Sequence, residues 1–121
     1  GWWWARGVAG AGALHQVAPT TVRAGAAFDV KVLAGVWGEG REPAVRYAAW
    51  SLQLLQDGQP FGPALAPVRS GREGERVAVW FTATAPAVSA SGAPPLTWRL
   101  RFRFDGQDKE VAGPHPITVV P

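Results

Sequence analysis

The sequence contains no cysteine, and this absence excludes disulfide bonds and thiolate chemistry. It contains only two histidines, His15 and His115, which lie near the two ends of the sequence. Zinc sites usually take three or four protein ligands, so two histidines without a neighbouring acid make a poor metal site. We therefore expect the protein to hold neither a metal ion nor any other cofactor.

Charge of one sign and long apolar runs are also scarce. Twelve basic residues stand against nine acidic residues, which are scattered among them, and the net charge is only +3. Proteins that bind nucleic acid usually carry a more strongly charged and clustered basic surface. No apolar run reaches the roughly 20 residues that a membrane-spanning helix needs. The sequence therefore predicts no nucleic-acid partner and no membrane-spanning helix among these residues.

The motifs of common catalytic sites are missing as well. The serines at positions 51, 70, 89 and 91 lie in no G-x-S-x-G elbow. Most carboxylates fall beside predicted turns, where Asp commonly bonds its own backbone. Gly38 and Gly40, in the run WGEGRE, lack the lysine and the following helix of a phosphate-binding loop. We therefore predict that the protein is not an enzyme.

What the sequence does contain is apolar and polar residues that alternate with a period of two. Residues 96–104 alternate without a fault, and residues 28–36 and 46–56 follow the same pattern. This period indicates β-strands with one apolar face. Asp-Gly follows two of these runs, at 57–58 and 105–106, and Asp-Gly after a strand is a strong hairpin signal.

Shorter runs predict further strands at residues 14–17, 20–23, 61–68, 77–82 and 117–120, and residues 109–111 are a candidate return strand after the second Asp-Gly turn. The predicted strand at residues 61–68 is restricted to a sheet edge by prolines 60, 63 and 67, because proline has no backbone N–H to donate to a neighbouring strand. Residues 70–75 and 85–95 are predicted to be loops. Seven or eight short strands predict an all-β, immunoglobulin-like, two-sheet antiparallel sandwich, with an up-and-down barrel as the alternative. The predicted core consists of Phe28, Val30, Val32, Trp50, Leu52, Leu54, Val79, Phe81, Trp98, Leu100 and Phe102.

The chain divides into two parts of different composition. Residues 14–121 carry the strand pattern and are predicted to form one sandwich domain. Residues 1–13, GWWWARGVAGAGA, are rich in Trp, Gly and Ala and have neither strand nor helix periodicity. We interpret this segment as the remnant of a linker or of a juxtamembrane region.

Two stretches resemble known families. Residues 19–34, PTTVRAGAAFDVKVLA, resemble the opening of bacterial immunoglobulin-like domains, in which a proline, a short strand, a glycine turn and an alternating strand follow one another. Within residues 77–120, the run VWFTATAPAVSASGAPPLTWRLRF and then PITVV are similar to the arrestin-like pattern, a weaker resemblance. The residues that carry it are Phe81, Pro86, Ser89, Trp98, Leu100 and Ile117. These resemblances imply a sandwich fold and, for the second, an adaptor that acts through protein contacts.

Arginines at alternate positions form the first candidate binding feature. In the predicted strand 96–104, Arg99, Arg101 and Arg103 project from one face, about 6.5–7 Å apart. The predicted neighbouring strand, residues 46–54, places no acid beside them. The stripe is either a solvated face or a surface for an acidic protein partner.

Exposed tryptophans form the second feature. Trp80 alternates away from Val79 and Phe81, so we expect it to be half exposed or covered by a loop, and we include it among the partner-binding residues. A cluster of three, Trp2, Trp3 and Trp4, is the candidate anchor to a membrane or to a partner. Such aromatic residues either stack on sugars, lie at a membrane interface, pack on a neighbouring domain, or fold back over an open sheet end.

These observations favour a non-catalytic protein-interaction or structural module of a larger envelope or surface protein. An arrestin-like adaptor is one form of this hypothesis, and a carbohydrate-binding module that uses exposed Trp is the alternative. The expected partners are another protein, acidic in one version, and a neighbouring domain of the same parent chain. The expected location is extracytoplasmic, in the periplasm or at the cell surface, with a membrane anchor preceding Gly1 as one candidate.

Overall fold

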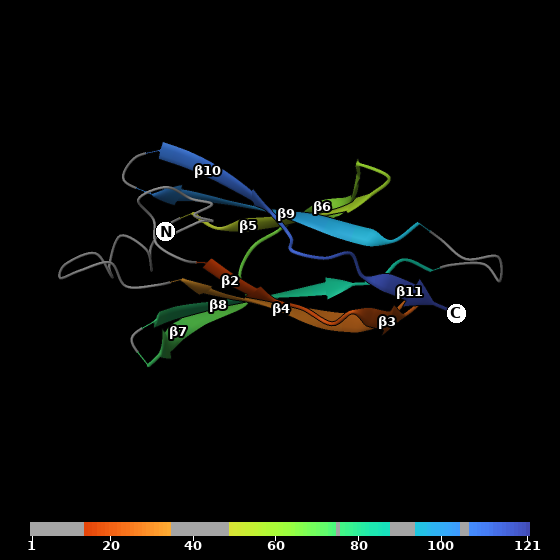
Figure 1. Ribbon diagram of the computed structural model, residues 1–121, viewed down its shortest axis with the longest axis horizontal. Helices are drawn as coiled ribbons and strands as arrows, with labels where there is room; N and C mark the ends of the chain where they lie inside the picture. Colours follow the sequence, from red (N-terminus) through yellow and green to blue (C-terminus); the bar gives the residue numbers. More distant parts are fainter. Residues whose placement is uncertain (1–13, 35–48, 75, 88–93, 105–106) are drawn as a thin grey trace.

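Two antiparallel sheets pack face to face in the computed structural model, which describes residues 14–34, 49–74, 76–87, 94–104 and 107–121. In order across the first sheet lie β10 (Gln107–Ala112), β9 (Leu96–Phe104), β5 (Ser51–Gln56) and β6 (Gln59–Leu65). Across the second lie β2 (Leu14–Val17), β4 (Ala27–Ala34), β8 (Arg76–Thr84) and β7 (Arg69–Glu73). The described residues contain no helix, and therefore none that could cross a membrane. The predicted all-β sandwich is confirmed (Figure 1).

A third, two-stranded sheet joins the beginning of the chain to its end. β3 (Thr21–Arg23) pairs in parallel with β11 (Thr118–Val120). The Thr118 N–H donates to the Thr20 carbonyl at 2.9 Å, and the Ala24 N–H donates to the Val120 carbonyl at 2.7 Å. Both strands lie at the same end of the sandwich (Figure 1). This pairing links segments about as distant in sequence as the chain allows.

The turn chemistry predicted from Asp57 and Gly58 is present. Gln56 pairs with Gln59, so only two residues connect β5 to β6, and both have positive φ, 50° at Asp57 and 73° at Gly58. A two-residue turn of this type matches the twist of antiparallel strands, and Asp and Gly are among the residues that adopt it. The prediction that the next strand lies at a sheet edge is also confirmed for the described strands, among which β6 is the last of its sheet and pairs with β5 alone.

The core lies between the two main sheets and is apolar. All eleven residues of the predicted core are buried, and no polar or charged residue is buried in the described part of the chain. Alternation explains this result, because every second side chain of β4, β5, β8 and β9 points at the opposite sheet. Trp50 and Phe102 stack there, with ring centroids 4.7 Å apart.

One expected loop is a strand. Residues 70–75 were expected to be a polar connection, but Arg69–Glu73 form β7, paired with β8 from Arg69↔Trp80 to Glu73↔Arg76. The strand is polar because it lies at the edge of its sheet, where side chains on both faces reach solvent. It is a strand because its backbone pairs with β8, and this pairing requires no alternation of apolar and polar side chains that a sequence could show. With β7 and the short strands β2, β3 and β11, the described residues form ten strands.

Trp98 ties the two sheets together from within the core. Its side chain is 1% exposed, and its Nε1–H donates a hydrogen bond of 2.9 Å to Oε1 of Gln16 on β2. Gln16 in turn donates from Nε2 to the Ala112 carbonyl at 3.2 Å. Gly113 donates its N–H to the Trp98 carbonyl at 2.9 Å and lies directly against the indole. One side chain of β9 therefore connects β2 with the end of β10.

Candidate functional site

The arginine stripe lies on the outer face of the first sheet. Arg99, Arg101 and Arg103 are exposed on β9, between the buried residues Leu100 and Phe102. β5 is one neighbour of β9, and it places Gln53 beside Arg99 and Ser51 beside Arg101. Within its described part, this neighbour brings no acid to the stripe, as expected.

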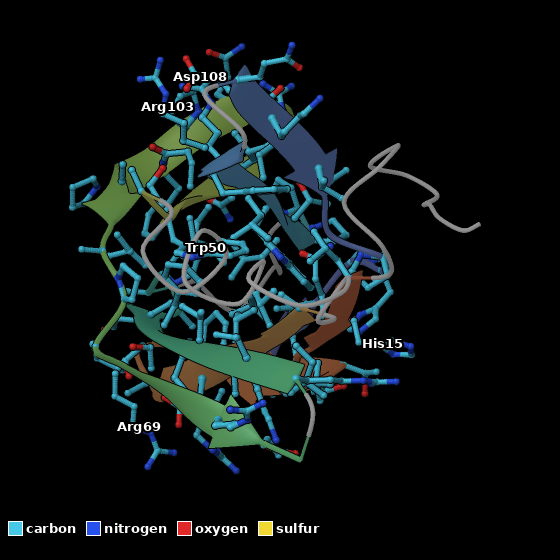
Figure 2. All side chains as sticks on the ribbon, turned by 90° about the vertical axis from the view of Figure 1, so that its left-hand side faces the viewer. His15, Trp50, Arg69, Arg103 and Asp108 are labelled. Carbon is cyan, nitrogen blue, oxygen red and sulfur yellow. The ribbon has the colours of Figure 1, made fainter. Side chains whose placement is uncertain are left out.

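The other neighbour, β10, brings two acids. Glu110 pairs in register with Arg101, and its Oε2 lies 2.7 Å from the arginine Nε. Asp108 pairs with Arg103, but the nearest oxygen is 3.9 Å from Nε, which is beyond hydrogen-bond range. Figure 2 shows Arg103 and Asp108 together at one outer surface of the sandwich. Two of the three arginines are therefore partly neutralised within the chain.

Arg99 differs from the other two. Its partner in β10 is Ala112 and its partner in β5 is Gln53, neither of which is acidic. Over the described part of the chain it makes no ion pair. Its charge acts on Glu110 only at a distance, through the electrostatic attraction that favours the ionised carboxylate. Arg99 is thus the arginine of the stripe whose charge is available to a partner.

A hollow of about 210 Å³ lies beside Arg99 on this face. Leu55 contributes an apolar wall and is only 6% exposed although it lies on the outer side of β5. Gln53 also lines the hollow, and its Nε2 donates hydrogen bonds to the carbonyls of Gly62, at 3.1 Å, and of Leu54, at 3.0 Å. The remaining lining residues are Ser51, Gly58, Pro60, Ala64 and Arg101. The hollow therefore combines two guanidinium groups with an apolar wall.

The acids on β10 could have been predicted from the sequence. A hairpin with a two-residue connection at Asp105-Gly106 pairs Phe104 with Gln107, and the register then places Glu110 opposite Arg101, as the structure has it. The sequence argument weighed only the neighbour on the other side, residues 46–54, and so treated the stripe as less neutralised than it is. The hollow beside Arg99 had no such signal, because it depends on the irregular pairing of β6 with β5, which brings Pro60 and Ala64 to its lining.

The Arg101–Glu110 pair gives the face a pH dependence. The hydrogen bond from Arg101 lowers the pKa of Glu110; slight burial opposes this shift, and the charges of Arg101 and Arg99 add to it. Because the pKa is lower in the folded protein than in the unfolded chain, the ionised carboxylate stabilises the fold above the unfolded pKa. This contribution is lost as the pH falls through the folded pKa.

We therefore expect Glu110→Gln to lower the free energy of unfolding at neutral pH by about 0.2–1 kcal/mol, the range for exposed ion pairs. The difference from the unaltered protein should shrink towards zero as the solution is acidified. Urea denaturation across a pH series measures it, with Asp108→Asn as the control of smaller effect, since the Asp108 side chain is 85% exposed. A difference that did not change with pH would contradict this origin.

Trp80, predicted to share in partner binding, lies on the opposite side of the molecule from the arginine stripe. It is half-buried on the outer face of the second sheet, where Lys31 of β4 and Arg69 of β7 flank it in register. The Arg69 guanidinium lies 4.0 Å from the ring centroid, and Lys31 Nζ lies 5.5 Å from it. Lys31 also pairs with Glu73, at 2.6 Å. Cations of this chain therefore cover the ring.

The remaining candidate residues do not gather at a site. Trp2, Trp3 and Trp4 lie outside the described residues. His15 is exposed on β2, and His115 packs edge-on against Trp98, with centroids 5.8 Å apart. Among the described residues, no three His, Asp or Glu side chains lie together as ligands for a metal ion.

Comparisons with known proteins identify the fold but no family. No family model matches the chain, and no curated protein matches it. Among solved structures, the chain is similar to the superoxide reductase (neelaredoxin) from Ignicoccus hospitalis, with a TM-score of 0.51 and 20% sequence identity. The similarity covers 88% of this chain and 79% of that chain. At this identity it concerns the fold alone.

This similarity corrects one expectation. The chain was predicted not to be an enzyme, because the motifs of common catalytic sites are missing from its sequence. A superoxide reductase is an enzyme, and it shares the all-β architecture. The physical reason is that a sandwich only provides two packed sheets, while chemistry depends on the side chains and loops placed upon them. The prediction is therefore contradicted, and this fold does not separate enzymes from binding proteins.

Proposed function

We propose that this chain is a protein-interaction module of a larger envelope or surface protein and that it binds an acidic segment of a partner on the outer face of β9. The observation that carries the proposal is Arg99, an exposed arginine without an ion pair in the described part of the chain, at the rim of the 210 Å³ hollow. The envelope location is supported by the immunoglobulin-like pattern of residues 19–34.

The chemistry of the hollow favours a carboxylate. A guanidinium offers several N–H donors in one plane and binds carboxylates through paired hydrogen bonds. Arg101 already donates to Glu110, and Arg99 lies two residues away on the same face. A carboxylate added here would meet the N–H donors of Arg99 and those N–H donors of Arg101 that Glu110 does not occupy. The apolar wall at Leu55 suits the aliphatic part of an acidic side chain. The charges are few, which favours a short acidic peptide over a polyanion.

A carbohydrate partner gains no support from the described residues. Stacking on sugars needs exposed aromatic faces, but Trp50 and Trp98 are buried in the core. The ring of Trp80 is covered by Arg69. We therefore develop only the acidic-partner proposal.

The test compares two variants that remove the same charge at different places. Arg99→Gln changes the hollow, whereas Arg23→Gln changes another exposed arginine, on β3. Binding of a blocked peptide of alternating Glu and Gly is measured by isothermal titration at low and at physiological salt. We expect Arg99→Gln to weaken binding by about tenfold and Arg23→Gln to leave it nearly unchanged. Binding of the unaltered protein should fall with salt, because exposed charges are screened within about 8 Å at physiological ionic strength.

Two results would count against the proposal. Equal losses in the two variants would mean that the peptide responds only to net charge. Equal or tighter binding of a single-stranded oligonucleotide would make the face a general anion surface. As a further check, the triple variant with Gln at 99, 101 and 103 should lose partners that the unaltered protein recovers from its native source.

A further inference from the structure

The strand β8 is covered along only part of the edge that faces β7. β7 pairs with it from Glu73↔Arg76 to Arg69↔Trp80, and the Val68 N–H donates to the Trp80 carbonyl at 2.8 Å. The chain before Val68 belongs to the connection from β6, in the other sheet. β8 itself continues to Thr84 and extends past the start of β7 (Figure 1). Among the described residues no strand pairs with this part of β8, so its last residues form an open sheet edge there.

The backbone groups of Thr82 and Thr84 point towards this open side. The Trp80 carbonyl faces β7, while just beyond the strand the Ala85 N–H donates to the Ala26 carbonyl on the β4 side, at 2.8 Å. Successive residues of an antiparallel strand direct their N–H and C=O groups to alternate sides, so those of Thr82 and Thr84 face the same way as Trp80. Within the part of the chain that the structure describes, they have no backbone partner.

An apolar groove of about 430 Å³ lies beside this edge, between the two sheets. Leu54, Phe61 and Leu65 of the first sheet line one side, and all three also touch the core. The other lining residues are Gly62, Pro63, Thr82, Thr84, Ala85, Pro86 and Ala87. None of these ten residues is charged. Where the open edge begins, Val68 is 61% exposed, one of two large apolar residues that reach solvent in the described part.

The open edge of β8 lacks the features that usually protect sheet edges. Proteins discourage edge pairing with prolines, charges or bulges. The edge strand β6 has Pro60 and Pro63, and its pairing with β5 is interrupted by a register shift. The segment from Phe81 to Thr84 has neither proline nor charge. The groove therefore borders the less protected of the two edges.

We infer that the Thr82–Thr84 edge of β8 binds an extended peptide strand of a partner protein, which continues the line of β7 and inserts uncharged apolar side chains into the groove. The unpaired N–H and C=O groups require a second backbone, which an added strand supplies. The side chains of such a strand alternate between the two faces of its sheet. Every second one then points at Leu54, Phe61 and Leu65, so the groove selects apolar residues at alternate positions.

A second copy of this chain does not fit the groove. If two copies paired through the same edge, each would present β8, whose inward side chains Phe81 and Ala83 are already buried in their own core, 0% and 2% exposed. The outward side chains, Thr82 and Thr84, would remain outside, so the groove would stay empty. The side chains of a separate peptide segment are not buried in a core of their own, so it can supply both the backbone for the edge and the side chains for the groove.

The test uses a defined peptide and follows individual amides. The probe is the blocked heptapeptide Lys-Thr-Val-Thr-Val-Thr-Lys, and hydrogen exchange is measured by NMR. In the free protein we expect rapid exchange at Thr82 and Thr84 and slow exchange at Phe81 and Ala83, which face β4. Added peptide should slow exchange at the two threonines in a saturable way. A peptide N-methylated at its threonines keeps the valine side chains that enter the groove but loses the N–H donors that face β8 in an antiparallel pairing, and it should bind at least about tenfold more weakly.

Two variants at one position separate backbone from side chain. Thr84→Pro removes the N–H that faces the open edge and blocks pairing, so it should weaken peptide binding at least about tenfold. Thr84→Val keeps the backbone and changes only the outward side chain, so it should bind normally. Arg99→Gln should bind this peptide normally too, and Thr84→Pro should keep its affinity for the acidic peptide. The two proposed surfaces are therefore tested independently.

Four outcomes would overturn the inference. Slow exchange at Thr82 and Thr84 in the free protein would show that the edge is already covered. No protection at millimolar heptapeptide, or equal binding of the N-methylated peptide, would show that the edge does not pair. Protection that rises with protein concentration, without peptide, would make a second copy the occupant. The N-methylated peptide keeps the test decisive even if Thr84→Pro fails to fold.

Discussion

Replacing Trp98 by Ala is expected to lower the free energy of unfolding by about 3–5 kcal/mol. The indole is 1% exposed between the sheets, and its removal leaves a cavity that the surrounding strands cannot fill. The change also removes the donor of the 2.9 Å hydrogen bond that Oε1 of Gln16 accepts from the indole, so this oxygen loses its partner. Both effects have the same sign, and they act where β2, β9 and the end of β10 meet.

Urea or thermal denaturation of Trp98→Ala measures this loss. Thr97→Ala is the matched control, because Thr97 is the preceding residue of the same strand but points to solvent. Its effect should stay within about 1 kcal/mol, the span of strand propensities. Trp98→Phe should fall between the two, since it keeps an aromatic ring and loses the hydrogen bond. Equal losses of unfolding free energy for Thr97→Ala and Trp98→Ala would contradict the role of Trp98 in holding the two sheets together.

Gly113→Ala should destabilise the fold by about 1–3 kcal/mol, the usual cost of adding a methyl group to a well-packed region. A Cβ built at Gly113 would lie 2.5 Å from Cδ2 and from Cε2 of the Trp98 indole and 2.8 Å from Cζ2. The backbone conformation is not the obstacle, because Gly113 is not among the residues with positive φ. The indole cannot give way easily, since Gln16 holds its Nε1 and the core surrounds it.

Gly71→Ala is the control for Gly113→Ala. An added Cβ at Gly71 meets nothing within 4 Å, and its φ is not positive either, so its stability should change little. The clash can also be tested directly in a double variant. In the Trp98→Ala background the ring is gone, and Gly113→Ala should then cost almost nothing, which is a coupling of the kind that contacting residues show. Additive losses would contradict a clash with the indole.

The strands and the core could be predicted from local pattern. Alternation with a period of two in residues 28–34, 51–56 and 96–104 indicates strands because a strand directs successive side chains to opposite faces. Alternation in these and the neighbouring runs identified eleven of the buried residues. Asp57 and Gly58 predicted their turn because few residues adopt positive φ easily. The immunoglobulin-like and arrestin-like resemblances of the sequence stay predictions, since no family model matches.

The candidate sites could be predicted only in part. The stripe on β9 follows from alternation, but the ion pairs with β10 depend on register, and the hollow beside Arg99 depends on the path of β6. Trp80 and the arginines were grouped by the sequence argument, whereas β8 and β9 belong to different sheets and their outer faces point in opposite directions. Nothing in a single strand's pattern says which sheet it joins.

The sequence by itself determined the class of fold, the inward and outward faces of the long strands, and eleven residues of the core, because all three follow from interactions between near neighbours in the chain. The tertiary structure alone decided the strand order, the parallel pairing of β3 with β11, the contact of Gly113 with Trp98 and the open edge at Thr82–Thr84. The open edge exists because β7 is shorter than β8. That difference arises where the chain passes from β6 in one sheet to β7 in the other. The periodicity of the side chains does not indicate where this passage takes place.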